Sequence, residues 1–138
     1  VHISGGMSML TRAREAAHAI KSKVIGVSLL TSLDQKDVEK VFFNDIRKVA
    51  DNLFDLAKEA NMDGIVCSAH ELKYARTNIP NLLKIVPGIR LSSDNDDQKR
   101  VMSPGEALKL GANHLVIGRP ITESKHPNAE LEKIYETL

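Results

Sequence analysis

The chain has 138 residues, of which 42% are hydrophobic and 27% are charged, and its 19 basic residues nearly balance 18 acidic ones. This length fits one domain with a buried core, and the near-neutral charge argues against a nucleic-acid-binding surface, which needs a concentrated basic stripe. There is no apolar run of the roughly 20 residues that span a bilayer. No signal peptide opens the chain, and Cys67 has no partner for an internal disulfide, so we expect a cytoplasmic protein.

Short apolar runs alternate with longer amphipathic stretches along the chain. The pattern predicts strands at residues 1–3, 23–30, 64–69, 82–88 and 114–118, and helices at 7–20, 35–60, 71–78, 104–110 and 127–137. The second helical stretch is expected to break near Phe43–Asn44. The runs are apolar almost throughout, which is typical of strands that are buried on both faces of a parallel sheet.

Three serine-led motifs support the helix starts. "SLDQ" (32–35), "SAHE" (68–71) and "SPGE" (103–106) each place serine three residues before Gln or Glu. This spacing is the capping box, in which two side chains satisfy amides of the first turn. Asn61 and Gly111 stand where helices end and a left-handed residue is useful.

Repeated strand–helix units predict a parallel α/β fold. Two architectures remain open, a doubly wound sheet or a piece of a (β/α)₈ barrel. A full barrel needs about 250 residues, so five strands would be little more than half of one. The chain also begins with Val1 inside an apolar run, and we therefore expect residues 1–138 to be one part of a longer domain.

In both architectures functional groups lie at the carboxyl ends of the strands. The last two predicted strands each end near a glycine and an arginine, in "PGIR" (87–90) and "VIGRPIT" (116–122). Gly118 permits close approach to backbone N–H groups, and Arg119 offers a planar fork of donors for a phosphate. Alone, each has a plainer reading: a tight turn for Gly118, a surface ion pair for Arg119.

Other chemistries find little support. The five histidines show no metal-ligand spacing, and Cys67 has no CxxC partner, so we expect no metal. Neither GxGxxG nor a P-loop is present, which disfavours a dinucleotide or P-loop nucleotide. Thr31 and Ser32 are more typical of helix caps than of ligands, and Gln98 would by default be a solvated loop residue.

Taken together, the strand ends resemble one family. "VHISGG", "SLLTS", "DGIVCSAHE", "VPGIR", "DQKRVMSPGEALKLGA" and "LVIGRPIT" occur in this order and are similar to the bacterial type of orotidine 5′-phosphate decarboxylase, across essentially all 138 residues. The resemblance implies a (β/α)₈ barrel, of which this chain supplies roughly strands 4–8. It implies removal of CO₂ from orotidine 5′-phosphate to give UMP without metal or cofactor, in a homodimer.

The resemblance also assigns residues. Thr31 falls where the family contacts bound nucleotide, and Gln98 falls on the residue that reaches the ligand from a loop. Arg90, Gly118 and Arg119 fall on phosphate-binding positions.

One part of the family pattern is missing. The family's catalytic centre is an Asp-Lys array with a DxKxxD motif after the third strand, and nothing in this chain matches it. We therefore expect no catalytic residue here, and we expect an amino-terminal half of the barrel as the chain's partner. Two alternatives stay open. One is another phosphate-binding barrel enzyme, such as a sugar-phosphate synthase or epimerase; the other is a non-catalytic half-barrel fragment.

Overall fold

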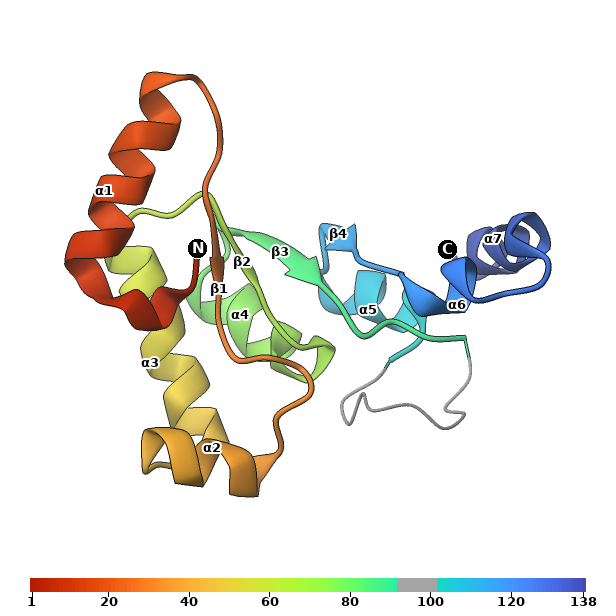
Figure 1. The fold of residues 1–138 in the computed structure, drawn as a ribbon, viewed down its shortest axis with the longest axis horizontal. Coiled ribbons are helices and arrows are strands. Elements are labelled where there is room, and N and C mark those ends of the chain that lie inside the picture. The colour runs from red at the N-terminus through yellow and green to blue at the C-terminus, as the bar shows by residue number, and fades with distance from the viewer. Residues whose placement is uncertain (92–101) are drawn as a thin grey trace.

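The computed structural model describes residues 1–91 and 102–138 (Figure 1). The helices are α1 (Gly6–Ala19), α2 (Gln35–Phe42), α3 (Ile46–Glu59), α4 (Leu72–Asn78), α5 (Pro104–Leu110), α6 (Arg119–Thr122) and α7 (Pro127–Tyr135), with two 3₁₀ turns, η1 (Ile3–Gly5) and η2 (Ala69–Glu71). The strands are β1 (Ile25–Val27), β2 (Gly64–Val66), β3 (Leu83–Val86) and β4 (His114–Leu115). No helix among the described residues is long and apolar enough to cross a membrane.

The four strands form one parallel sheet in the order β1-β2-β3-β4. Strand order therefore follows chain order, with a helical connection between successive strands. A doubly wound sheet reverses direction at a switch point, whereas a (β/α)₈ barrel does not. The sheet is therefore arranged as a partial barrel, and the carboxyl ends of its strands share one edge.

The two faces of the sheet differ in burial. Residues paired in parallel register share a face, and Ile65 pairs with Gly26 and Lys84. This face is closed by the helices, since Ile65 and Val86 have no exposed surface. The opposite face is apolar and only half-buried, and it is made by Ile25, Val27, Val66, Leu83 and Ile85. We call these five residues the inner face.

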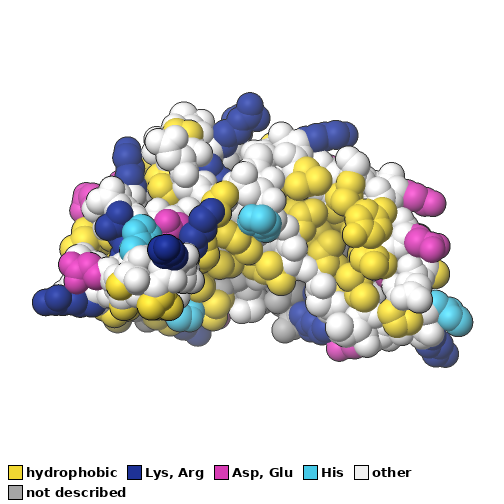
Figure 2. All heavy atoms as spheres, turned by 90° about the horizontal axis from the view of Figure 1, so that it is seen from above, with side chains coloured by type: hydrophobic (Ala, Val, Ile, Leu, Met, Phe, Trp, Pro, Cys, Tyr) yellow, Lys and Arg dark blue, Asp and Glu magenta, His cyan; other side chains and the backbone are white. Residues whose placement is uncertain are grey.

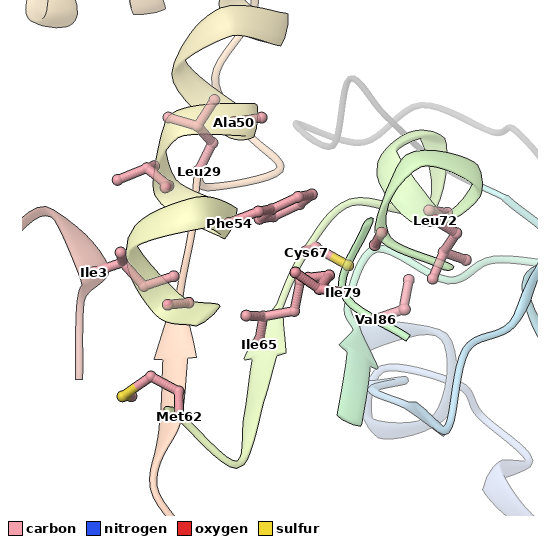
Figure 3. Close-up of a cluster of buried hydrophobic side chains, with 14 of the residues drawn as sticks. Ile3, Leu29, Ala50, Phe54, Met62, Ile65, Cys67, Leu72, Ile79 and Val86 are labelled. Carbon is pink, nitrogen blue, oxygen red and sulfur yellow. The ribbon is translucent and has the colours of Figure 1, made fainter. Parts of the chain in front are cut away.

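The core lies between the sheet and its helices. Figure 3 shows Phe54 of α3 reaching towards the part of the chain that carries Cys67 and Leu72, and all three side chains are fully buried. Gly26 is required in β1 by close packing, because a Cβ there would lie 2.7 Å from the Ile3 side chain. The strands are therefore held from one side by a dense apolar layer.

Several local predictions are confirmed. The second helical stretch breaks where expected, because Phe43 adopts a left-handed conformation with φ 55° between α2 and α3. Capping boxes form at Ser68 and Ser103, as the "SAHE" and "SPGE" motifs predicted. Helix α5 has the predicted bounds, and Asn61 and Gly111 have positive φ.

Other predictions are wrong. Residues 1–3 make a single bridge, His2 to Val27, and then turn into η1 instead of forming a strand. The third capping box is formed by Asp34 and Asp37, not by Ser32, because the aspartate two residues later makes both reciprocal bonds (3.0 and 3.1 Å). The predicted strand at 114–118 ends at Leu115, and Arg119 begins a short helix, α6, that the apolar pattern did not predict.

A polar contact links α1 to the amino ends of β1 and β2. The Asp63 carboxylate accepts a hydrogen bond from the Val24 N–H at 2.8 Å, and His18 Nε2 lies 2.9 Å from the same oxygen. Burial raises the pKa of Asp63, but the hydrogen bonds from Val24 and His18 outweigh it and hold this pKa below its usual value. The ionised carboxylate therefore stabilises the fold.

Replacing Asp63 with Asn should lower the free energy of unfolding by about 1–2 kcal/mol at pH 7. A depressed pKa contributes stability that is complete above the unfolded value, about 3.9, and is lost as pH falls through the folded value. The difference in the free energy of unfolding between Asp63→Asn and the unmodified chain, measured by urea titration, should thus become smaller below pH 4. Glu15→Gln, at an exposed pair on α1, is the control and should change stability by less than about 0.5 kcal/mol. A gap that is constant with pH would contradict this role.

Candidate functional site

The carboxyl ends of β3 and β4 lie next to each other. These strands are paired, and the Val116 N–H donates to the Val86 carbonyl at 2.9 Å. Each is followed within four residues by a glycine and an arginine, Gly88 with Arg90 and Gly118 with Arg119. The structure therefore brings the two predicted anion-binding segments to neighbouring positions on one edge of the sheet.

The segment after β3 is fixed by its backbone. Gly88 has φ 75°, a conformation that L side chains rarely adopt, and it is buried. Ile89 then pairs with Met102, and the Arg90 N–H donates to the Met102 carbonyl at 3.1 Å. Arg90 is half-buried, and its Nη1 donates to the Ile89 carbonyl at 2.9 Å. The chain is thus joined on both sides of residues 92–101. Gln98 lies outside the described residues.

The segment after β4 is open. Gly118 is exposed, and a Cβ built on it would meet no atom within 4 Å. Its carbonyl accepts from the N–H groups of Ile121 and Thr122 at 2.9 and 3.1 Å, which starts α6. Arg119 is half-buried at the first position of that helix. The exposed backbone at Gly118 and the guanidinium of Arg119 therefore make this turn suited to a negatively charged ligand.

Thr31 lies apart from these two segments. It follows β1, which is separated from β3 by β2, and only 8% of its surface is exposed. It lies beyond the same edge of the sheet as Arg90 and Arg119. The structure leaves Thr31 little surface for direct contact with a ligand.

One buried charge was missed by sequence reasoning. Lys84, inside the apolar run of β3, is 5% exposed, and its Nζ donates to the Pro80 carbonyl at 2.9 Å. Burial lowers the pKa of Lys84. Because Lys84 shares the helix-covered face with Ile65, it does not face the inner side of the sheet. Its place among apolar neighbours in the sequence gave no signal of this.

Two arginines give the strand ends positive charge. Among the described residues that follow the strands, the ionisable side chains include Arg90, Arg119, His70 and Glu71. Glu71 is used in a cap, accepting from the Ser68 N–H at 2.8 Å. No group of three or more His, Cys, Asp or Glu in residues 1–91 and 102–138 could hold a metal ion. The arrangement is therefore suited to holding an anion.

Comparisons with known proteins give a consistent result. Residues 1–134 match the model of the orotidine 5′-phosphate decarboxylase / HUMPS family. An orotidine 5′-phosphate decarboxylase of Ehrlichia chaffeensis is 45% identical over 138 residues, covering 97% of this chain and 59% of that protein. One from Wigglesworthia glossinidia brevipalpis is 44% identical, covering 100% and 62%.

Solved structures agree. The crystal structure of orotidine 5′-phosphate decarboxylase from Lactobacillus acidophilus superposes with a TM-score of 0.80 at 30% identity, covering 99% of this chain and 61% of that one. The enzyme from Methanocaldococcus jannaschii, complexed with the inhibitor BMP, has the same fold at a TM-score of 0.75 and 24% identity. The chain spans about 60% of the length of these relatives. It belongs to the orotidine 5′-phosphate decarboxylase / HUMPS family.

Proposed function

We propose that this chain carries the phosphate- and nucleotide-binding part of an orotidine 5′-phosphate decarboxylase, an enzyme that releases CO₂ from orotidine 5′-phosphate to form UMP. The observation that carries the proposal is the pairing of β3 with β4, which aligns the Gly88–Arg90 and Gly118–Arg119 segments on one edge. The relatives that are 41–45% identical bear the decarboxylase name, which favours it over the other enzymes of the family.

In this proposal Arg90, Gly118 and Arg119 hold the phosphate of the substrate. The guanidinium groups supply charge-assisted hydrogen bonds, and the open space at Gly118 admits a phosphate oxygen to the backbone. The family resemblance assigns a ligand contact to Gln98, which lies outside the described residues. Thr31 contacts the nucleotide, which requires its loop to expose more of it than the 8% seen here.

The phosphate contacts would serve a reaction in which no bond to phosphorus changes. Binding energy from a remote part of a substrate can drive loop closure and hold the reacting part in a costly geometry. The proton that replaces CO₂ would come from the Asp-Lys array typical of the family, for which this sequence has no match. We therefore assign no catalytic residue to this chain and expect it to be inactive alone.

The apolar inner face is evidence that another part of the barrel packs against this sheet. Five apolar side chains of the inner face are half-buried, although parallel sheets in α/β proteins are normally covered on both faces. Further apolar surface occurs where Val116, Tyr135 and Leu138 are 49–65% exposed, and Figure 2 shows apolar side chains gathered over the part of the chain that holds β4, α6 and α7. We propose that the other strands of the barrel cover the inner face, and that the completed barrel is a cytoplasmic homodimer.

The phosphate assignment predicts a loss on Arg119→Ala. In a complete enzyme containing this chain, Arg119→Ala should reduce transition-state stabilisation by about 2–4 kcal/mol, because a charge-assisted contact and the closure it drives are both lost. The value of kcat/KM for orotidine 5′-phosphate should therefore fall by roughly 30- to 1,000-fold. Steady-state decarboxylation measured by the change in absorbance would test this. Arg12→Ala is the matched control, since Arg12 is exposed on α1 and pairs only with Glu15 among the described residues. Equal kinetics for Arg119→Ala and Arg12→Ala would refute the assignment.

If this chain binds the phosphate and another part of the barrel carries the catalytic residues, the two parts should restore activity when they are combined. The purified chain should not release CO₂ from orotidine 5′-phosphate alone. Activity should appear when it is refolded with the portion of the Ehrlichia chaffeensis relative that this chain does not cover. Activity of the isolated chain would contradict the division. A stable complex of the two parts that binds UMP and turns nothing over would favour the non-catalytic alternative, and one that binds pentose phosphates but not UMP would favour a sugar-phosphate enzyme.

A further inference from the structure

A cavity lies between α3 and the η2–α4 segment, which follows β2. Its volume is about 580 Å³, and its wall on α3 includes Arg47, Asp51 and Phe54. The facing wall includes Lys73 and Tyr74 of α4. None of the residues proposed to bind the substrate lines it. A volume of this size accommodates a small organic molecule.

The cavity has an aromatic base. Phe54 is fully buried and packs against Tyr74, with ring centroids 6.1 Å apart and planes inclined by 34°. Ile46, which is half-buried, extends this apolar surface along α3. Flat rings pack well on such a surface, in offset or tilted geometry.

Two exposed cationic side chains and two less exposed carboxylates line the cavity. Arg47 and Lys73 are exposed on opposite walls, and neither side chain forms an ion pair or hydrogen bond with the residues that the structure describes. The carboxylates are those of Asp51 and Glu71, and the Glu71 carboxylate accepts from the Ser68 N–H. Two cationic side chains thus face one cavity from opposite sides, an arrangement complementary to a negatively charged group.

Asp51 supplies the remaining polar contact. Its carboxylate is half-buried and receives no hydrogen bond from residues 1–91 or 102–138. Burial raises the pKa of Asp51, and nearby Arg47 partly opposes this. A desolvated carboxylate without a donor is stabilised when a ligand provides an N–H or O–H group.

We propose that this cavity is a binding site for a small aromatic anion with a hydrogen-bond donor on its ring. The ring packs on the half-buried Tyr74, which Phe54 supports from beneath, the anionic group lies between Arg47 and Lys73, and the ring donor bonds to Asp51. The site is separate from the phosphate-binding segments and does not depend on the function proposed for them.

Two probes of equal ring and opposite charge test the proposal. Indole-3-acetate carries the ring, the ring N–H and a carboxylate, whereas tryptamine carries the same ring with an ammonium group. Each is titrated into the isotope-labelled chain and followed by residue-specific NMR shifts. Indole-3-acetate should bind at least threefold more tightly, with shifts centred on Tyr74 and Thr77. Equal affinities, or shifts centred on Ile85 of the inner face, would overturn the proposal.

Variants separate charge from ring packing. Arg47→Ala should weaken binding of indole-3-acetate by about threefold to tenfold, as expected for a charged contact at an exposed rim, and should leave tryptamine binding unchanged or stronger. Lys48→Ala is the matched control, because Lys48 is exposed on the same helix and does not line the cavity. If Arg47→Ala and Lys48→Ala weaken the binding of indole-3-acetate equally, the effect comes from the loss of any positive charge on the helix, and the proposed site is contradicted. The comparison of the two probes on the unmodified chain decides the matter even if a variant misfolds.

Discussion

The structure depends on a parallel sheet that is packed tightly on one face and only half-covered on the other. Ile65, with no exposed surface, lies in the layer between the sheet and its helices, and this layer fixes the positions of all four strands. On the opposite side the inner face is as apolar as the core itself. Apolar surface of this kind is stable only when something excludes water from it. The helix-covered side of the sheet therefore positions the strand ends, and in our proposal the remaining strands of the barrel pack on the other side.

This constraint separates binding from chemistry. The two arginine-bearing segments follow strands that pair with each other, so their relative position is set within this chain. The described strand ends hold cationic and glycine positions suited to an anion, and the Asp-Lys array of the family has no counterpart in the sequence. If the phosphate-binding residues and the proton donor lie on two portions of one barrel, they would be correctly positioned relative to each other only when the sheet closes. Covering the inner face would thus complete both the core and the site.

The sequence was sufficient where a local signal determines the local structure. Helix α5, Pro104–Leu110, was predicted with its bounds because a capping serine precedes it, a proline is its first residue and a glycine follows it. It was insufficient where neighbours compete: Asp34 and Asp37 displaced the predicted serine cap. Helix α6 has only one turn, too short for a periodic pattern, and Lys84 is buried because of tertiary packing that an apolar run does not reveal. The phosphate positions came from glycine and arginine at strand ends together with the family resemblance, since spacing alone does not identify an anion.

Hydroxyl-radical footprinting of the inner face tests the account most directly. The chain alone should be oxidised readily at Ile25, Val27, Val66, Leu83 and Ile85, while Ile65 and Val86 on the helix-covered face should be protected. Adding the complementary portion of the Ehrlichia chaffeensis relative should then protect the inner face. A monodisperse chain whose inner face is already protected without a partner, or a complex in which it stays oxidised, would contradict the claim that the rest of a barrel covers this sheet.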